Sequence, residues 1–286
     1  MKTIYLDNAA TTKVDDSVVK EMNKYHSESY GNASSSHLIG KEAKRAISEA
    51  RETIAKSIGA KDEEIFFTSG GTESNNWALK GLFFAHPNKK HLIVTRIEHD
   101  CIMETCRWLE SQGAKITYLG VDKHGFVDPK DLEKAITPNT LLVSIIQGNN
   151  EVGTIQDLEA IGNICRKKGV YLHTDACQSY TKTLLDVKKQ NIDLITLNAH
   201  KIHGPKGVGA LYVRKGIKIT PLFHGGGQEN FFRSGTENVP GIMGFAKAVK
   251  IANSSDVKRM VKLRDKFIEN LLKIPNTKLN GPTGEK

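Results

Sequence analysis

Short apolar runs that alternate with amphipathic segments are the feature that most constrains the fold of this chain. Six runs have strand character: 64–68, 91–95, 115–119, 141–146, 170–174 and 194–197. Helical patterns lie at 40–58, 157–168, 239–252 and 256–272. Such alternation predicts an α/β fold with a largely parallel, buried sheet flanked by helices. The run 208–215 follows a strand directly between Gly207 and Gly216, so we expect it to be antiparallel and the sheet to be mixed.

The charge of the chain suits an anionic ligand, an acidic partner or nucleic acid. Its 286 residues include 41 Lys plus Arg and 32 Asp plus Glu, for a formal net charge of +9. The basic residues are scattered in small groups. The densest stretch, 258–266, is typical of a solvated helix face. The sequence therefore favours a small-molecule enzyme over a nucleic-acid binder.

Membrane and secretory functions are not expected. No apolar stretch approaches the roughly 18 residues that a membrane span needs. The N-terminus reaches Asp7 before any apolar signal core develops, which predicts a cytoplasmic protein. The four cysteines, Cys101, Cys106, Cys165 and Cys177, are too few and too irregularly spaced for a disulfide framework or a zinc ribbon, so we expect reduced thiols.

A candidate anion cradle lies where the first strand passes into a helix. The segment 68–76 reads Thr-Ser-Gly-Gly-Thr-Glu-Ser-Asn-Asn. Gly71 lets the backbone approach a phosphate, free amides at the helix start face it, and Thr72 adds a hydroxyl. The spacing matches neither the P-loop nor the dinucleotide fingerprint, and a plain strand-to-helix turn is the alternative.

Two later strands end in residues that could face one ligand. Asp175 ends the run at 170–174, and Asn198-Ala199-His200-Lys201 follows the next run. In open α/β sheets ligands bind at this carboxyl edge. A lysine there can form an imine with an aldehyde cofactor, and a carboxylate can hold a pyridine nitrogen protonated, which indicates pyridoxal phosphate. A surface lysine is the alternative reading of Lys201.

Strand alternation also places His173, Asp175 and Cys177 on one face, as a soft metal site would require. No second cluster at metal spacing supports a metal, so none is predicted. His99, just after the strand at 91–95, could stack on a cofactor ring or shuttle protons, or could simply begin a helix. The segments 149–153 and 233–236 add amides, a cation and a hydroxyl.

Taken in order, these residues resemble the cysteine desulfurases, which are class V aminotransferase-like, fold type I pyridoxal phosphate enzymes. The matching motifs cover nearly the whole chain: 5–12, 31–37, 68–76, 98–99, 149–153, 173–175, 200–201 with 204–207, and 233–236. The resemblance implies a homodimer that acts on L-cysteine. It further implies L-alanine as the product, with sulfur leaving as a persulfide for iron-sulfur cluster assembly or tRNA thiolation.

The resemblance also assigns roles to individual residues. Lys201 would be the Schiff-base lysine, Asp175 would pair with the pyridine nitrogen, and His99 would stack on the ring. Gln178 and Asn150 would lie near the phenolate oxygen and the substrate. Phosphate would be bound by Gly71, Thr72 and His200, joined by Thr236 of the partner subunit. Asn198 stands where the family usually has serine, a change of about one hydrogen bond or ~1 kcal/mol.

A second departure concerns the nucleophile. In the family a catalytic cysteine lies on a mobile loop well after the Arg-Ser-Gly-Thr motif, and a downstream arginine binds the substrate carboxylate. No cysteine of this chain occupies that place, and no neighbouring side chain replaces a covalent nucleophile. We expect a split enzyme whose second polypeptide carries the cysteine loop, or a truncated chain. The alternative is loss of the desulfurase step.

The sequence therefore predicts a large cofactor-binding domain over 15–255, with 1–14 and 256–286 forming an incomplete small α+β domain. The predicted function is pyridoxal phosphate-dependent cysteine desulfuration, with a second segment supplying the nucleophile and an iron-sulfur scaffold or other sulfur acceptor as partner. The alternatives are selenocysteine lyase, another class V reaction, and a catalytically silent scaffold subunit that binds an acidic carrier or RNA.

Overall fold

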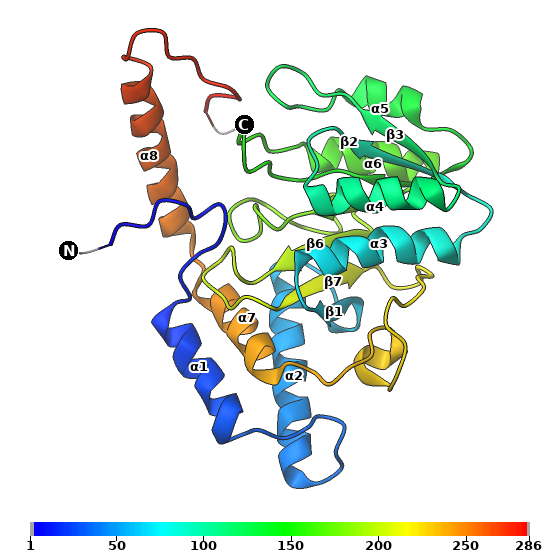
Figure 1. The fold of residues 1–286 in the computed structure, drawn as a ribbon, viewed down its shortest axis with the longest axis vertical. Coiled ribbons are helices and arrows are strands. Elements are labelled where there is room, and N and C mark those ends of the chain that lie inside the picture. Colours follow the sequence, from blue (N-terminus) through cyan, green and yellow to red (C-terminus); the bar gives the residue numbers. More distant parts are fainter. Residues whose placement is uncertain (1–2, 285–286) are drawn as a thin grey trace.

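A computed structural model describes residues 3–284 and contains one seven-stranded sheet (Figure 1). The strands are β1 (Ile65–Thr68), β2 (His91–Thr95), β3 (Lys115–Leu119), β4 (Thr140–Ser144), β5 (Tyr171–Asp175), β6 (Leu194–Asn198) and β7 (Gly209–Val213). Their order across the sheet is β1-β7-β6-β5-β4-β2-β3. β7 pairs antiparallel with both β1 and β6, and the remaining pairs are parallel. The predicted mixed, mostly parallel sheet is confirmed.

Helices cover both faces of this sheet (Figure 1). α2 (Leu38–Ser57), α5 (Pro129–Ala135), α6 (Leu158–Lys168) and α7 (Val239–Ile251) contribute to one apolar core, and α3 (Gly71–Ala85) and α4 (Asp100–Ser111) to the other. All five residues of β2, β4, β6 and β7 are buried. Burial on both faces explains why these strands read as continuous apolar runs rather than alternating ones.

Local sequence signals set several helix ends. Asp128 caps α5 through Lys130 N, with Pro129 as the first helical residue. Asp157 caps α6, which ends in Arg166, Lys167 and Lys168 and stops at Gly169 in the left-handed conformation. Basic residues in a last turn compensate the negative end of the helix dipole.

Two helices differ from the sequence prediction. α1 (Asp16–Ser27) was not predicted, although Val18, Met22 and Tyr25 recur at helical spacing and pack on the core. α8 (Ser254–Leu271) begins two residues earlier than expected, since the Asn253 side chain accepts a hydrogen bond from Asp256 N and caps the helix there. The break between α7 and α8 is therefore only Ala252 and Asn253.

α8 projects from the rest of the chain beside the covered sheet (Figure 1). It contains no buried residue. Met260, Leu263, Phe267 and Leu271 recur every three or four residues, so they form one apolar stripe. These four side chains, which we call the α8 stripe, are 36–63% exposed. The stripe lacks a partner within residues 3–284.

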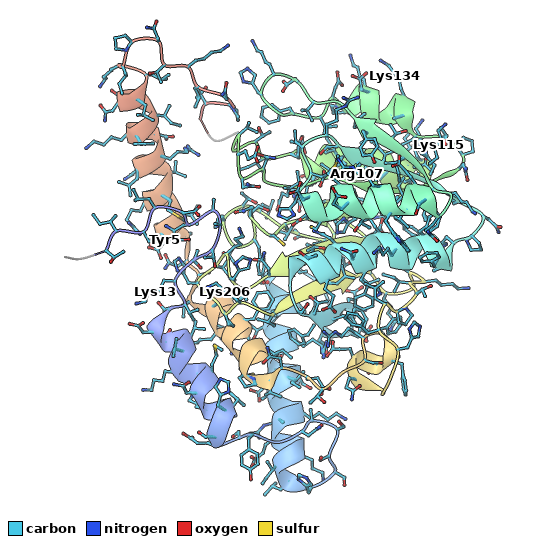
Figure 2. The ribbon with its side chains drawn as sticks, viewed as in Figure 1. Tyr5, Lys13, Arg107, Lys115, Lys134 and Lys206 are labelled. Carbon is cyan, nitrogen blue, oxygen red and sulfur yellow. The ribbon has the colours of Figure 1, made fainter. Side chains whose placement is uncertain are left out.

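Basic side chains lie on separate parts of the surface, as the scattered sequence pattern predicts. Lys13 and Lys206 lie near the N-terminal segment, whereas Arg107, Lys115 and Lys134 belong to the α4, β3 and α5 region (Figure 2). No helix in the described part of the chain is long and apolar enough to cross a membrane.

Candidate active site

The carboxyl ends of the parallel strands bring the predicted site residues to one edge of the sheet. β5 ends in Asp175 and β6 in Asn198, and these two strands are direct neighbours. The segments that leave this edge contain Gln178 after β5 and Lys201 after β6. His99 follows the end of β2 on the same edge. The topology therefore assembles residues that lie about 100 positions apart in the sequence.

Asp175 is held in a defined orientation by two donors. Its Oδ2 accepts from Asn75 Nδ2 at 2.7 Å, and its Oδ1 accepts from the Cys177 backbone N–H at 2.9 Å. The Asp175 side chain is nearly buried and Asn75 is fully buried. Because Asn75 lies one turn after Gly71 on α3, the helix that forms the cradle also orients the carboxylate. Asn75 was missed by the sequence analysis, and its position inside the 68–76 motif was the available signal.

His99 begins α4 and is exposed. Its Nδ1 accepts from Cys101 N at 3.1 Å and lies 3.1 Å from Cys101 Sγ. Cys101 Sγ in turn accepts from Asn75 Nδ2 at 3.0 Å. Thr72 and His99 line one shared hollow. His99 therefore starts a helix, as one of the two interpretations expects, and its contact with a cofactor ring stays a prediction.

Lys201 and Gln178 converge on one backbone carbonyl. Gln178 Nε2 donates to Ala9 O at 3.0 Å, and Lys201 Nζ donates to the same oxygen. Burial lowers the pKa of Lys201 below its usual value, while the charges of Cys177, Asp7 and Asp175 oppose that shift. A lysine with a lowered pKa has a larger neutral fraction, which is the form that acts as a nucleophile or base.

The N-terminal segment also packs at this edge of the sheet, although its partners there are far away in the sequence. Thr12 N and Thr12 Oγ1 both donate to His200 O, at 2.9 and 2.8 Å. His200 Nδ1 lies 3.1 Å from Thr11 Oγ1. Burial, followed by the charges of Lys201 and Lys206, lowers the pKa of His200. Residues 9–12 thus form part of the wall around Lys201, which no local spacing in the sequence indicated.

The predicted cradle has the geometry that a close ligand requires. Gly70 has a φ of 150°, a conformation that favours glycine. A Cβ on Gly71 would lie 2.7 Å from Cys177 Sγ, so a larger residue there would force the Cys177 side chain to move. The first helical amides of α3, at Gly71 and Thr72, point out of the helix start. The Asn198 side-chain oxygen is buried beside them without a hydrogen-bond partner in the described residues.

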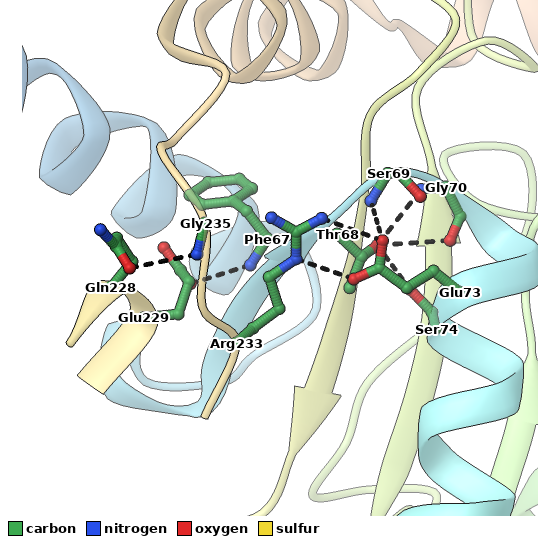
Figure 3. A network of polar contacts seen from close by, with 10 residues as sticks. All are labelled: Phe67, Thr68, Ser69, Gly70, Glu73, Ser74, Gln228, Glu229, Arg233 and Gly235. Atoms are coloured by element: carbon green, nitrogen blue, oxygen red, sulfur yellow. Dashed lines mark hydrogen bonds and ion pairs between the residues drawn. The ribbon is translucent and has the colours of Figure 1, made fainter. Parts of the chain in front are cut away.

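An ion pair between Glu73 and Arg233 attaches the loop after β7 to this cradle (Figure 3), and a second ion pair, between Glu229 and Arg51, attaches the loop to α2. Glu73 accepts from Arg233 Nε at 2.8 Å and Nη2 at 3.1 Å, and from Ser69 N at 2.8 Å. Glu229 accepts from Arg51 through both of its carboxylate oxygens, each at 2.7 Å, and from Phe67 N at 2.9 Å. The guanidinium of Arg233 is therefore already paired with the Glu73 carboxylate of the same chain.

Two predicted residues stay apart from the others in this chain. Thr236 is exposed and lines a hollow with Ser69 and Arg233, on the outer side of the cradle. Asn150 is exposed, and its side chain makes no hydrogen bond to a described residue. Their predicted roles toward a cofactor or substrate therefore stay predictions.

Glu98 is a buried carboxyl that the sequence analysis did not single out as a separate group. Its Oε1 accepts from Thr95 Oγ1 at 2.6 Å and from Ile146 N at 2.8 Å, and its Oε2 has no partner in the described residues. Burial raises the pKa of Glu98 to about 8, and the nearby charge of Asp175 adds to this shift. The Glu98 carboxyl is therefore largely protonated and uncharged at neutral pH.

The ring of His173 is held between two hydroxyl groups. Both ring nitrogens of His173 are engaged, at 2.8 Å from Ser144 Oγ and 3.0 Å from Thr196 Oγ1. Burial lowers its pKa to about 4, so the ring is neutral. Over residues 3–284, no group of three or more His, Cys, Asp or Glu side chains is arranged to hold a metal ion.

Comparison with known proteins agrees with this architecture. The family model described as aminotransferase class V matches residues 4–286. The chain therefore belongs to the class V aminotransferase family, and within it to the cysteine desulfurases. A relative from Methanosarcina thermophila, named cysteine desulfurase IscS, is 52% identical over 98% of this chain and 70% of its own length. One from Dictyoglomus turgidum with the same name is 50% identical over 98% and 73%.

Solved structures give the same result. A NifS-like protein of 45% identity superposes with a TM-score of 0.90 over 95% of this chain and 75% of its own. A structure described as SspA in complex with cysteine has 41% identity and a TM-score of 0.90, over 98% and 81%. These matches confirm the predicted fold class and family.

Proposed function

We propose that this chain binds pyridoxal phosphate and L-cysteine in a cysteine desulfurase. The observation that carries the proposal is the grouping of Lys201 and Gln178 at Ala9 O, on the same sheet edge as the oriented carboxylate of Asp175. The overall reaction transfers the sulfur of cysteine to a thiol, giving alanine and a persulfide, so that cysteine plus R–SH becomes alanine plus R–S–SH. A sulfur acceptor, such as an iron-sulfur scaffold, would then take the outer sulfur.

The site fits the cofactor. The glycine cradle before α3 accepts a phosphate where a larger residue would collide with Cys177, and Gly71, Thr72 and His200 supply donors. Asn198 offers a side-chain amide there, with its oxygen still unpaired. Thr236 of the partner subunit would complete the phosphate site in a homodimer. When bound, pyridoxal phosphate supplies an electron sink for charge that develops on the substrate carbon.

Each residue of this site would have a separate role toward the cofactor or the substrate. Asp175, fixed by Asn75, would hold a proton at the ring nitrogen of the cofactor. His99, whose Nδ1 is orientated by Cys101 N, would contact the ring. Lys201, whose pKa is lowered by burial, would hold the cofactor aldehyde and would move a proton at the substrate carbon. Gln178 and Asn150 would orient the phenolate oxygen and the substrate.

The thiols near the site are poorly suited to attack sulfur. Burial raises the pKa of Cys101 to about 11 and places that of Cys177 well above its usual value. Because the thiolate is the nucleophile, neither is reactive near neutral pH. The other two cysteines are buried. We therefore assign the nucleophilic cysteine to a segment beyond residue 286, on the same or a second polypeptide.

The α8 stripe would receive that segment. The similar IscS relatives extend further, since the matched region is 70–73% of their length. The stripe is exposed and amphipathic, as an unfinished layer of a small domain would be. This supports residues 15–255 as the large domain, with 1–14 and 256–286 as part of a small one. A cytoplasmic location stays a prediction.

Borohydride reduction of the cofactor-loaded chain, followed by peptide mass mapping, tests the cofactor assignment. We expect the pyridoxyl adduct at Lys201 and its loss in Lys201→Ala. Lys182→Ala is the matched control, because Lys182 is a neighbouring half-buried lysine whose pKa burial also lowers. An adduct that persists in Lys201→Ala would reject the assignment.

The nucleophile assignment needs a second experiment. The chain alone should bind the cofactor without forming alanine from cysteine. Adding the C-terminal segment of the Methanosarcina thermophila relative should restore alanine and persulfide formation. The same segment with its cysteines changed to serine should not. Turnover by the unassisted chain would contradict the proposal.

A further inference from the structure

A cavity of about 530 Å³ lies at the sheet edge opposite the candidate active site. Tyr171, the first residue of β5, lines it, whereas Asp175, the last residue of that strand, belongs to the active site. At about 3.3 Å per residue the two positions are about 13 Å apart. The proposed desulfurase reaction uses no residue of this cavity.

Basic side chains from different segments converge on the cavity. Lys61 precedes β1, Lys89 precedes β2, Arg166 lies in the last turn of α6, Lys188 lies between β5 and β6, and Arg214 follows β7. Among the described residues, Lys61, Lys89 and Lys188 form no ion pair. Residues that are distant in sequence thus place unpaired ammonium groups around one volume.

The two carboxylates in the cavity wall are already engaged. Glu64 accepts from Lys61 N at 2.9 Å and from Lys215 N at 2.8 Å. Asp193 accepts from Leu172 N at 2.8 Å and from Arg214 Nε at 2.7 Å. Each oxygen therefore has a donor, and the two terminal nitrogens of Arg214 remain available. The cavity keeps an excess of positive charge and of unused donors.

Tyr212 on β7 adds a hydroxyl to the cavity wall. The residue is only 2% exposed, and its hydroxyl makes no hydrogen bond to any residue in 3–284, so this donor is free to bind a ligand in the cavity. Tyr171 and His86 also line the cavity. Their ring centroids are 5.5 Å apart, which gives the cavity an aromatic wall.

We propose that this cavity binds a phosphate chain, as in a nucleoside di- or triphosphate or an inorganic polyphosphate. Several converging cations and a hydroxyl donor match an anion with many acceptor oxygens. The cavity has the size of small-molecule sites, whereas nucleic acid would need an extended basic track. The aromatic wall would contact a base if the ligand is a nucleotide.

Calorimetric titration of the full chain with inorganic tripolyphosphate and, separately, with ATP tests this site. We expect saturable one-to-one binding that weakens as salt rises from about 50 to 200 mM. Equal affinity for both ligands would indicate that the phosphate chain alone is recognised. Binding of ATP alone would indicate that the base contributes. Absence of saturable binding by either ligand would overturn the proposal.

Variants distinguish a defined site from diffuse charge. Lys61→Glu with Lys188→Glu should weaken binding at least about tenfold, and Tyr212→Phe, which removes only the hydroxyl, about threefold. Lys262→Glu with Lys266→Glu on exposed α8 makes the same change in net charge, and should leave affinity within about twofold. Equal losses in the two double variants would overturn the proposal. Binding is measured without pyridoxal phosphate or cysteine, so the outcome does not depend on desulfurase activity.

Discussion

The side-chain amide of Asn75 controls how Asp175 lies in the site. It donates to Asp175 Oδ2 at 2.7 Å in a buried environment. An amide is neutral there, so it orientates the carboxylate without competing for a proton. A carboxylate at position 75 would instead repel Asp175, and the pair would retain a proton near neutral pH.

Asn75→Asp should therefore weaken pyridoxal phosphate binding, by at least about tenfold at pH 8, which corresponds to ~1.4 kcal/mol. Affinity should recover partly at pH 6, because a protonated carboxyl again donates to Asp175. Titration of cofactor absorbance at both pH values measures this. Asn88→Asp, in the exposed turn after α3, is the control and should bind like the parent chain. A pH-independent loss would argue for simple misfolding.

Glu98 makes the stability of the fold depend on pH. Its pKa is about 8 in the folded chain and 4.5 as its usual value. Stability from the protonated form is complete below about pH 4.5 and is lost as pH rises toward 8. Glu98→Gln retains an acceptor for Thr95 and Ile146 and never ionises. Relative to the parent chain, the unfolding free energy of Glu98→Gln should therefore increase as the pH rises from about 4.5 to 8, by up to about 4 kcal/mol. Parallel stability curves in urea titrations would show that Glu98 does not titrate there.

At the scale of elements, the loop after β7 is fixed to the cradle by a partly buried ion pair. Glu73 and Arg233 are 7% and 22% exposed in their side chains. Removing one partner leaves a charge in a partly buried place, which is far more costly than losing a surface pair.

Arg233→Ala should destabilise the chain by about 3 kcal/mol in urea unfolding. The double change Arg233→Ala with Glu73→Gln should recover part of this, because no unpaired charge remains. Lys273→Ala is the matched control, since Lys273 pairs with Glu269 on the exposed surface and should cost less than about 1 kcal/mol. If Arg233→Ala and Lys273→Ala lowered the unfolding free energy equally, the Arg233–Glu73 pair would behave as an exposed surface pair, contrary to this prediction.

Truncating a phenylalanine should have opposite consequences in α8 and in α7. Phe267 is 63% exposed, whereas Phe245 in α7 is fully buried against Tyr180. Phe267→Ala should change the unfolding free energy of this chain by less than about 0.5 kcal/mol. Phe245→Ala should cost about 3 to 5 kcal/mol. If Phe267→Ala proved equally costly, the stripe would already have a partner in the chain itself.

At the scale of the whole molecule, the sheet was predictable because burial on both faces leaves a continuous apolar run in most strands, although the edge strand β3 is only partly buried. α1 was not predicted, although Val18, Met22 and Tyr25 recur at helical spacing and pack on the core. The sheet edge was predictable from Asp175 and Lys201, because parallel strands share a carboxyl end. The contact of Ala9 with Lys201 was not, because it depends on tertiary packing between residues 192 positions apart.

That last contact has a consequence for the order in which the chain is made. Residues 9–12 leave the ribosome first, but their partners at 200–203 follow about 190 residues later. At about 5 to 20 residues per second, the segment waits roughly 10 to 40 s without its docking surface. We expect proteases to cut it in nascent chains arrested before residue 200 and to spare it in chains arrested well beyond residue 203. The wall around Lys201 would then close only after β6 and the segment that follows it have been made.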